Sequence, residues 1–281
     1  MKGFQIAQGT VLGRDHYMSR LNNQDGRHVI EEPDITVAIV SDGCGDKVSS
    51  QHSEVGAIYG SKITARFVHR YARLALGKYG SIPLNQKSFW EGARQDVLAQ
   101  IRVQAMQMGD NFVEEVLKHY LFTVVGVLMY EKETAFFTLG DGVVYVNEEE
   151  IHVGPFPNNE PPYMGLALLD PGIVKIPQDL LSIKVHRIIK TSDLKSFLLA
   201  TDGLDKFKEA ENKPMPGKKD LVGPIRQFWA DDRYFQNEFA IQRKLMLVTQ
   251  DYMANDWDHK RVIRENGHLK DDTTIVVGRR H

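Results

Sequence analysis

The sequence predicts an α+β fold with antiparallel strands, and three observations lead to this prediction. Several segments rich in β-branched and aromatic residues are bounded by turn formers, as expected for strands. The connections "EKET" and "GDG" between neighbouring strands are short and polar, which indicates an antiparallel meander in the middle of the chain. Segments with helical spacing stand in blocks between runs of strands, and this arrangement favours antiparallel layers over alternating βαβ units.

The predicted elements follow from the spacing of apolar residues. The predicted strands are residues 37–40, 122–130, 135–139, 143–146, 182–189, 197–201 and 273–278. The predicted helices are residues 49–76, 87–107 and 235–253. In the second helix, Phe89, Ala93, Val97 and Ile101 fall on one face, which we expect to pack on a sheet.

Residues 154–172 contain five prolines and several turn formers, so we expect a long ordered loop. Loops of this length are uncommon unless they are functional. The segment is therefore either a surface excursion between strands or a flap beside a functional site.

Composition excludes several classes of protein. The chain has 281 residues with 35 basic and 37 acidic residues, and this balance provides no overall field to hold nucleic acid or an anionic membrane. One cysteine cannot form an internal disulfide, which fits a reducing compartment. The N-terminal residues lack the apolar core of a secretory signal, and the longest apolar run is far below the ~20 residues of a membrane span. We therefore expect a cytoplasmic protein, whereas the length leaves one or two domains open.

Acidic residues recur at the tips of predicted strands or in the adjacent turns. They are Asp25, Asp42, Asp141, Asp202, and Asp271 with Asp272. One aspartate beside a glycine is most simply a turn former, but its repetition weakens that interpretation. If the tips converge, the carboxylates would repel one another unless a hard cation lay between them. An all-oxygen set suits Mg²⁺ or Mn²⁺, whereas zinc would call for histidine or cysteine ligands that do not cluster in the sequence.

Two other chemistries fit the stretch "SDGCGDKVSS" poorly. An EF-hand would need glycine where Lys47 stands and a bidentate acid where Ser53 stands. A cysteine-based phosphatase would need a phosphate cradle that ends in arginine, but no arginine follows Cys44 until Arg66. Cys44 is then more simply a small residue in a turn.

The ordered motifs "RLNNQD", "SDGCGD", "FTVVGVLMY…FFTLGDG", "LLATDGLDKF" and "DDTTIVV" resemble those of the metal-dependent protein serine/threonine phosphatases of type 2C, in a bacterial-like form. They run from Arg20 to Val277. The resemblance implies an antiparallel β-sandwich flanked by helices on both sides, in α-β-β-α layers. It also implies a single phosphatase domain over residues 1–281, because one active site would draw on both ends of the chain.

The resemblance also implies the metal ligands. Asp42 matches the aspartate that bridges two Mn²⁺ or Mg²⁺ ions, and Gly43 matches the glycine that offers its backbone carbonyl. Asp202 and Asp271 match ligands of one ion, and Asp141 matches the aspartate associated with a third, weaker metal.

Arg20 and Asp25 have the spacing of the family's phosphate-binding arginine and the aspartate that supports the metal ligands. A guanidinium suits a phosphoryl group because it donates two parallel hydrogen bonds. The implied reaction is hydrolysis of phosphoserine or phosphothreonine esters in proteins by a metal-activated water. The partner would be a phosphorylated protein, with no nucleic acid and no membrane, and the sequence does not indicate an oligomeric state.

The sequence also departs from the family pattern. Cys44 stands where eukaryotic members carry a histidine that is a proposed general acid, Asp46 replaces a glycine, and Gln24 stands where glutamate is frequent. The histidines show no ligand spacing. Two alternatives therefore stay open, namely a pseudophosphatase that binds phosphoproteins without turnover and a phosphatase of small phosphoesters.

Overall fold

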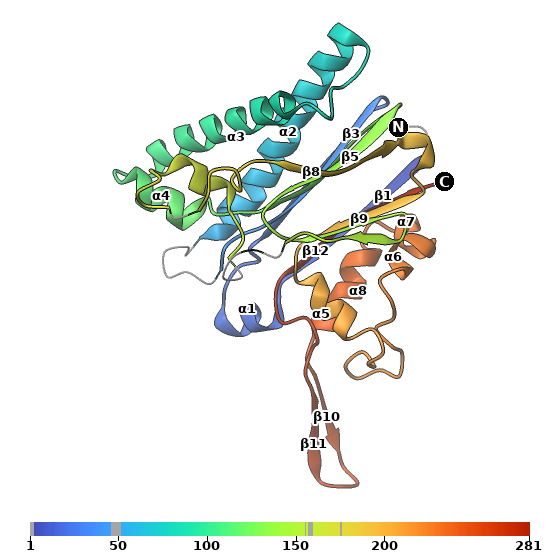
Figure 1. The fold of residues 1–281 in the computed structure, drawn as a ribbon. Helices are drawn as coiled ribbons and strands as arrows, with labels where there is room; N and C mark the ends of the chain where they lie inside the picture. The colour runs from blue at the N-terminus through green and yellow to red at the C-terminus, as the bar shows by residue number, and fades with distance from the viewer. Residues whose placement is uncertain (1–2, 46–51, 155, 157–159, 175) are drawn as a thin grey trace.

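Two five-stranded antiparallel sheets form the centre of the molecule, and helices cover the outer face of each (Figure 1). The computed structural model describes residues 3–45, 52–154, 156, 160–174 and 176–281. This architecture confirms the expected α+β sandwich with α-β-β-α layers.

The sheets combine segments that are distant in the sequence. In the first sheet, in spatial order, stand β1 (Phe4–Val11), β12 (Thr273–Arg280), β9 (Ser196–Ala200), β6 (Val143–Val146) and β7 (Glu149–Ile151). In the second stand β2 (Asp25–Glu31), β3 (Ile35–Asp42), β4 (Val124–Tyr130), β5 (Glu133–Leu139) and β8 (Lys184–Lys190). Because β1 pairs with β12, the two ends of the chain lie side by side.

Strand β3 shows how the sequence builds the layers. Its apolar run is continuous because both of its faces are buried. Val37 and Ile39 point into the core beneath the helices of the second sheet, whereas Ala38 and Val40 point into the core between the two sheets. Alternation of side chains along the strand thus links two separate cores.

The helices divide between the two outer faces. Beside the second sheet lie α2 (Ser53–Tyr79), α3 (Lys87–Met108) and α4 (Phe112–His119). Beside the first sheet lie α5 (Leu204–Glu209), α6 (Gln227–Ala230), α7 (Arg233–Gln236) and α8 (Ala240–Thr249). The short α1 (Arg14–Ser19) follows β1, and the 3₁₀ turns η2 (Met164–Leu168) and η3 (Thr191–Asp193) lie in connections. Phe89, Ala93, Val97 and Ile101 of α3 are buried, as their spacing predicts.

The predicted helix over residues 235–253 is wrong at both ends. Asn237 is extended and its side chain accepts a hydrogen bond from the Phe239 N–H, which separates α7 from α8. After α8 the chain turns into a two-stranded hairpin, β10 (Tyr252–Asp256) and β11 (Arg261–Glu265), that projects from the body (Figure 1). The hairpin was not expected, because its sequence is polar and lacks the apolar alternation of a core strand.

The predicted loop over residues 154–172 is not a simple surface excursion in its described part. It contains η2, in which Met164 and Leu166 are buried against the helices of the second sheet. The Met164 N–H donates to the Phe122 carbonyl, 2.8 Å away, and so ties the loop to the segment that precedes β4.

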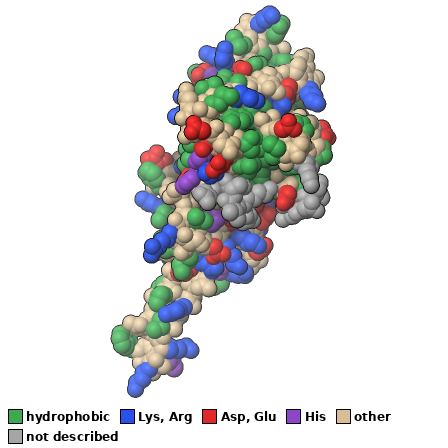
Figure 2. Space-filling model, turned by 90° about the vertical axis from the view of Figure 1, so that its left-hand side faces the viewer, with side chains coloured by type: hydrophobic (Ala, Val, Ile, Leu, Met, Phe, Trp, Pro, Cys, Tyr) green, Lys and Arg blue, Asp and Glu red, His purple; other side chains and the backbone are tan. Residues whose placement is uncertain are grey.

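The outer surface carries mixed charges. Figure 2 shows acidic and basic side chains interspersed on one face, with apolar and basic side chains on the projecting hairpin. Trp257 at the hairpin tip is 82% exposed. Among the described residues, no helix is long and apolar enough to cross a membrane.

Candidate metal centre

The predicted aspartates meet at one end of the sandwich. Asp25 opens β2 and Asp42 closes β3, and the two residues are direct partners in the antiparallel register. Asp141 lies between β5 and β6, Asp202 follows β9, and Asp271 precedes β12. Each aspartate therefore lies at or just beyond the end of a strand.

Thr201 ties this end of the first sheet to the second. Its hydroxyl donates to Oδ2 of Asp25 over 2.9 Å and accepts from the Thr274 N–H over 3.0 Å. Asp25 is 5% exposed, and its Oδ1 is buried without a hydrogen-bond partner among the described residues. Burial raises the pKa of Asp25 well above its usual range, and the charge of Asp272 raises it further.

The electrostatics of Asp42 show that the carboxylates converge. Burial raises the pKa of Asp42 well above its usual range, and the charges of Asp25, Asp202, Asp141 and Asp271 raise it further. All four of those carboxylates are therefore within electrostatic reach of Asp42. The fold of the two sheets therefore holds several like-charged carboxylates close enough to repel one another.

Asp141 and Asp202 respond to the same crowding. Burial raises the pKa of Asp141 to about 6. Surrounding protein, together with the charges of Asp141 and Asp271, raises the pKa of Asp202 to about 7.

Gly43 holds the backbone close on both sides. Its N–H donates to the Gln24 carbonyl over 3.0 Å, and it forms an isolated bridge with Phe122. A Cβ at this position would lie 2.8 Å from the carbonyl oxygens of both Gln24 and Ser53, so the strand end has no room for a side chain. Cys44 is buried, and its N–H donates to the Leu121 carbonyl.

The turn at Asp141 requires its two glycines. Gly140 has φ +89° and Gly142 has φ +133°, conformations that other residues rarely adopt. A Cβ on Gly142 would also collide with the Val125 side chain. These two positions fix where Asp141 leaves β5 and enters β6.

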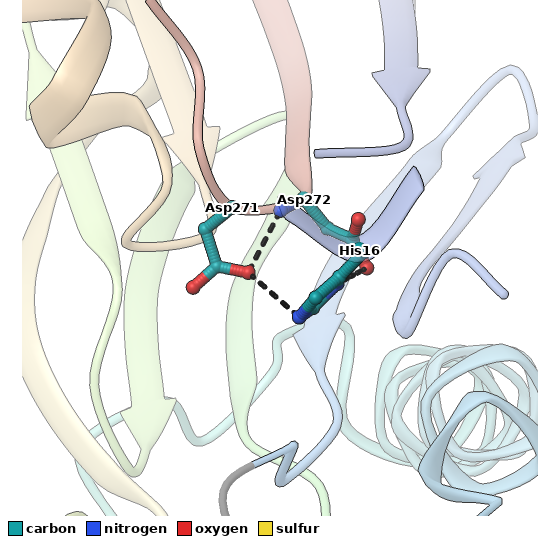
Figure 3. A group of neighbouring side chains, drawn as sticks. All are labelled: His16, Asp271 and Asp272. Carbon is teal, nitrogen blue, oxygen red and sulfur yellow. Dashed lines mark hydrogen bonds and ion pairs between the residues drawn. The ribbon is translucent and has the colours of Figure 1, made fainter. Parts of the chain in front are cut away.

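His16, Asp271 and Asp272 form a second cluster at the edge of the centre (Figure 3). His16 Nδ1 lies 3.0 Å from Asp272 Oδ2, and its Nε2 lies 3.6 Å from Asp271 Oδ1. The Asp272 carboxylate, which accepts from the protonated imidazole, raises the pKa of His16. No sequence pattern indicates this cluster, since His16 is separated from both aspartates by most of the chain.

Asp272 acts as an anchor in this cluster. Its Oδ1 accepts from the Gly13 N–H over 2.7 Å and its Oδ2 accepts from the Gln24 N–H over 2.5 Å. The buried carboxylate thereby fixes the entries to α1 and β2. Because these contacts already use its oxygens, Asp272 positions the ligand-bearing segments and is a poor candidate for a separate metal site.

Arg20 is the predicted site residue that the structure does not bring into contact with the aspartates. It is exposed at the end of α1 with φ +58°, and its side chain makes no ion pair with any described residue. The Gly43 carbonyl likewise has no described contact that assigns it a function. The predicted functions of both residues stay predictions.

The donor set fits a hard divalent cation. Asp42, Asp141, Asp202 and Asp271 offer carboxylate oxygens, and a cation among them would offset the repulsion that raises the pKa of Asp42. Oxygen donors suit Mg²⁺ and Mn²⁺. The fold thus defines an α-β-β-α sandwich protein with a cluster of acidic side chains at one end, and binding of a divalent metal by these residues stays a prediction.

Comparison with known proteins gives the family. Residues 12–237 match the family model "Protein phosphatase 2C", and the chain belongs to this family. Membership confirms the expected enzyme class, a metal-dependent protein serine/threonine phosphatase, and the expected cofactor, Mn²⁺ or Mg²⁺. Asp271 and β12 lie beyond the matched residues, so their place in the centre depends on the structure.

Solved structures share the fold at low sequence identity. A bacterial serine phosphatase with a point mutation is 18% identical, with 98% of each chain covered and a TM-score of 0.54. The serine/threonine phosphatase PstP/Ppp of Mycobacterium tuberculosis is 15% identical, with 99% of each chain covered and a TM-score of 0.52. Stp1 of Staphylococcus aureus is 18% identical over 98% of this chain and 94% of its own, with a TM-score of 0.50. A search of curated proteins finds no match.

Proposed function

We propose that the chain hydrolyses phosphoserine and phosphothreonine esters in proteins, with two divalent ions held by Asp42, Asp202 and Asp271 and a third near Asp141. The convergence of these carboxylates is the observation that carries the proposal, since the charges of Asp141, Asp202 and Asp271 all act on Asp42. A cytoplasmic location is part of the same proposal, and the single cysteine, which cannot form an internal disulfide, is consistent with it.

The chain's own residues would perform three tasks. Asp42 and Asp202 would bind the ions, and Asp25 would hold the strand end that carries Asp42, to which it is paired in the sheet. Arg20 is exposed at the end of α1, and its guanidinium would bind the phosphoryl oxygens of the substrate. When bound, Mn²⁺ or Mg²⁺ supplies a water of lowered pKa that can act as the nucleophile near neutral pH.

The first test is hydrolysis of p-nitrophenyl phosphate and of a phosphothreonine peptide, each with Mn²⁺ and with EDTA. We expect activity that depends on the metal and falls at least ~100-fold in Asp202→Asn, because a ligand and its charge are both lost. Asp179→Asn is the matched control, since Asp179 is an exposed aspartate that lies in the wall of a distant cavity. Equal activity in Asp202→Asn and Asp179→Asn would contradict the assignment.

Arg20 is tested separately because its task is binding. Arg20→Ala should raise KM for the phosphopeptide more than it lowers kcat, since the guanidinium would bind the phosphate before and during the reaction. An unchanged KM would remove Arg20 from the site.

A second candidate function is phosphoprotein binding without turnover. The buried Cys44 favours it, because this thiol stands where eukaryotic members carry a histidine that is a proposed general acid. Tight binding of the phosphopeptide with no hydrolysis at saturating Mn²⁺ would decide for this candidate.

A further inference from the structure

A small basic cavity lies beside the metal centre. It has a volume of about 330 Å³ and lies between the start of α1, helix α5 and the segment before β12. The charged and titratable residues in its wall are Arg14, Lys206, Glu209, Lys213, His268 and Lys270.

The cavity concentrates positive charge on a chain whose net charge is slightly negative. Four permanent cations face one carboxylate, that of Glu209, whereas the whole chain has a net charge of −2. Lys206 lies 2.8 Å from the Glu209 carboxylate and lowers its pKa, and the charges of Lys213 and Lys270 lower it further. The local excess of cations therefore exceeds what this single carboxylate can neutralise.

Two of the four cations are unpaired within the described residues. Arg14 is used, since it contacts the Asp15 carboxylate at 2.8 Å and donates to the Gly267 carbonyl. In contrast, the ammonium groups of Lys213 and Lys270 make no hydrogen bond or ion pair with any described side chain. They are free to bind an anion that enters from solvent.

The cavity is fixed to the metal centre by the backbone. Lys270 directly precedes Asp271, and its carbonyl accepts from the Asp15 N–H over 3.0 Å. Helix α5 begins two residues after Asp202, where Gly203 packs so closely on the Asp272 carbonyl that a Cβ would collide with it. The two segments that supply Asp202 and Asp271 therefore continue directly into the cavity wall.

We propose that this cavity binds an anionic group next to the phosphorylated residue of the substrate, either an acidic side chain or a second phosphate. The chain would then prefer acidic phosphopeptides. This inference rests on the proposed function, since it names the substrate class of the same site. An extended peptide advances about 3.3 Å per residue. Because the cavity wall continues directly from the segments that carry Asp202 and Asp271, a residue that flanks the phosphorylated one is the expected occupant.

The test compares three phosphothreonine peptides that differ only in the flanking residues, which are glutamine, glutamate or phosphoserine. For each, kcat/KM is measured in the wild type, in Lys213→Glu and in the control Lys219→Glu. Lys219 is also an exposed lysine but lies outside the cavity wall. The ratio of the acidic peptide to the glutamine peptide removes any general effect on the reaction.

The wild type should prefer an acidic peptide roughly five-fold, the size expected for one or two exposed charge pairs. Lys213→Glu should abolish this preference and Lys219→Glu should keep it. The preference should also fall in high salt, because exposed charges are screened. Whether glutamate or phosphoserine gives the larger ratio identifies the anion.

A ratio of one in the wild type, or equal ratios in the two variants, would overturn the proposal. If Lys213→Glu does not fold, Lys213→Gln takes its place. If no peptide is hydrolysed, the proposed function fails, and binding of the fluorescein-labelled peptides replaces kcat/KM. Tighter binding of the acidic peptide then supports the cavity, and equal binding contradicts it.

Discussion

Asp202 lies among other carboxylates, and the surrounding protein, together with their charges, raises the pKa of its carboxyl. The pKa of its carboxyl is about 7 in the folded chain, against an ordinary value of 3.8. A raised pKa of an acid means that the folded chain holds its proton more tightly than the unfolded chain does. In the absence of metal, ionisation of Asp202 therefore opposes folding.

We expect the metal-free protein to lose stability as pH rises from about 4 to about 7, because the folded state binds more protons than the unfolded state in that range. Asp141, with a pKa of about 6, acts in the same direction. Urea unfolding in EDTA at about pH 5 and about pH 8 measures the difference.

Excess Mn²⁺ should restore stability at the higher pH, since the ion binds the ionised carboxylates. Asp202→Asn is the matched variant, and in EDTA it should be less sensitive to pH than the wild type. Equal stability of the metal-free wild type at both pH values would contradict the clustering of charges.

Single residues of the site differ in how far the sequence predicts them. The aspartates are predictable, because each ends a strand and stands beside a turn or a recognisable motif. The contact of His16 with Asp272 is not predictable from the sequence, because it arises only when β1 and β12 are paired. The left-handed conformation of Arg20 at the end of α1 is not predictable either, because no residue type in that segment indicates it.

Helix α2 packs closely on the end of α4 at a glycine. Gly56 lies so close to the His119 carbonyl at the end of α4 that a Cβ would collide with it. Gly77, near the other end of α2, has no atom within 4 Å of the position a Cβ would take. One glycine of α2 therefore has no room for a side chain, whereas the other has open space.

Gly56→Ala should destabilise the fold by about 1–3 kcal/mol, because α2 or α4 must shift to make room. Gly77→Ala should stabilise it by about 0.5–1 kcal/mol, because alanine is the better helix former at an open position. The free energies of unfolding in urea give both values. Two variants with effects of the same sign would refute the close packing of α2 on α4.

Whole elements were predictable where their periodicity is strong. Strands β3, β4 and β5 were expected because both of their faces are buried, so their sequences are nearly all apolar. Strand β2 was missed because it lies at the sheet edge and carries polar residues. The break between α7 and α8 depends on one side-chain contact of Asn237, which a helical pattern does not register.

At the scale of the molecule, the proposed metal centre needs both sheets. Strands β2 and β3 of one sheet supply Asp25 and Asp42, and the ends of β9 and β12 in the other lead to Asp202 and Asp271. The core between the sheets is continuous, with Val40, Phe136 and Val276 among its members. We propose that residues 1–281 unfold as one unit, as the predicted single domain requires.

Two tryptophans test this on opposite sides of the sandwich. Trp90 of α3 is buried in the core beside the second sheet, and Trp229 of α6 is buried in the core beside the first. Each of two double variants keeps a single tryptophan: Trp229→Phe with Trp257→Phe keeps Trp90, and Trp90→Phe with Trp257→Phe keeps Trp229. In both variants, urea unfolding followed by tryptophan fluorescence should have the same midpoint as unfolding followed by far-UV circular dichroism. A fluorescence midpoint that differs from the circular dichroism midpoint of the same variant would indicate separate domains.

The pairing of β1 with β12 brings the first and last described residues together, since the His281 N–H donates to the Gly3 carbonyl over 2.7 Å. A short linker could therefore close the polypeptide into a ring without disturbing either strand. Reopening that ring between Asp256 and Arg261, at the tip of the projecting hairpin, would create a circular permutant. Every carboxylate of the centre would keep its strand in such a molecule, so the order in which the strands are connected could be changed while their arrangement in space stayed the same.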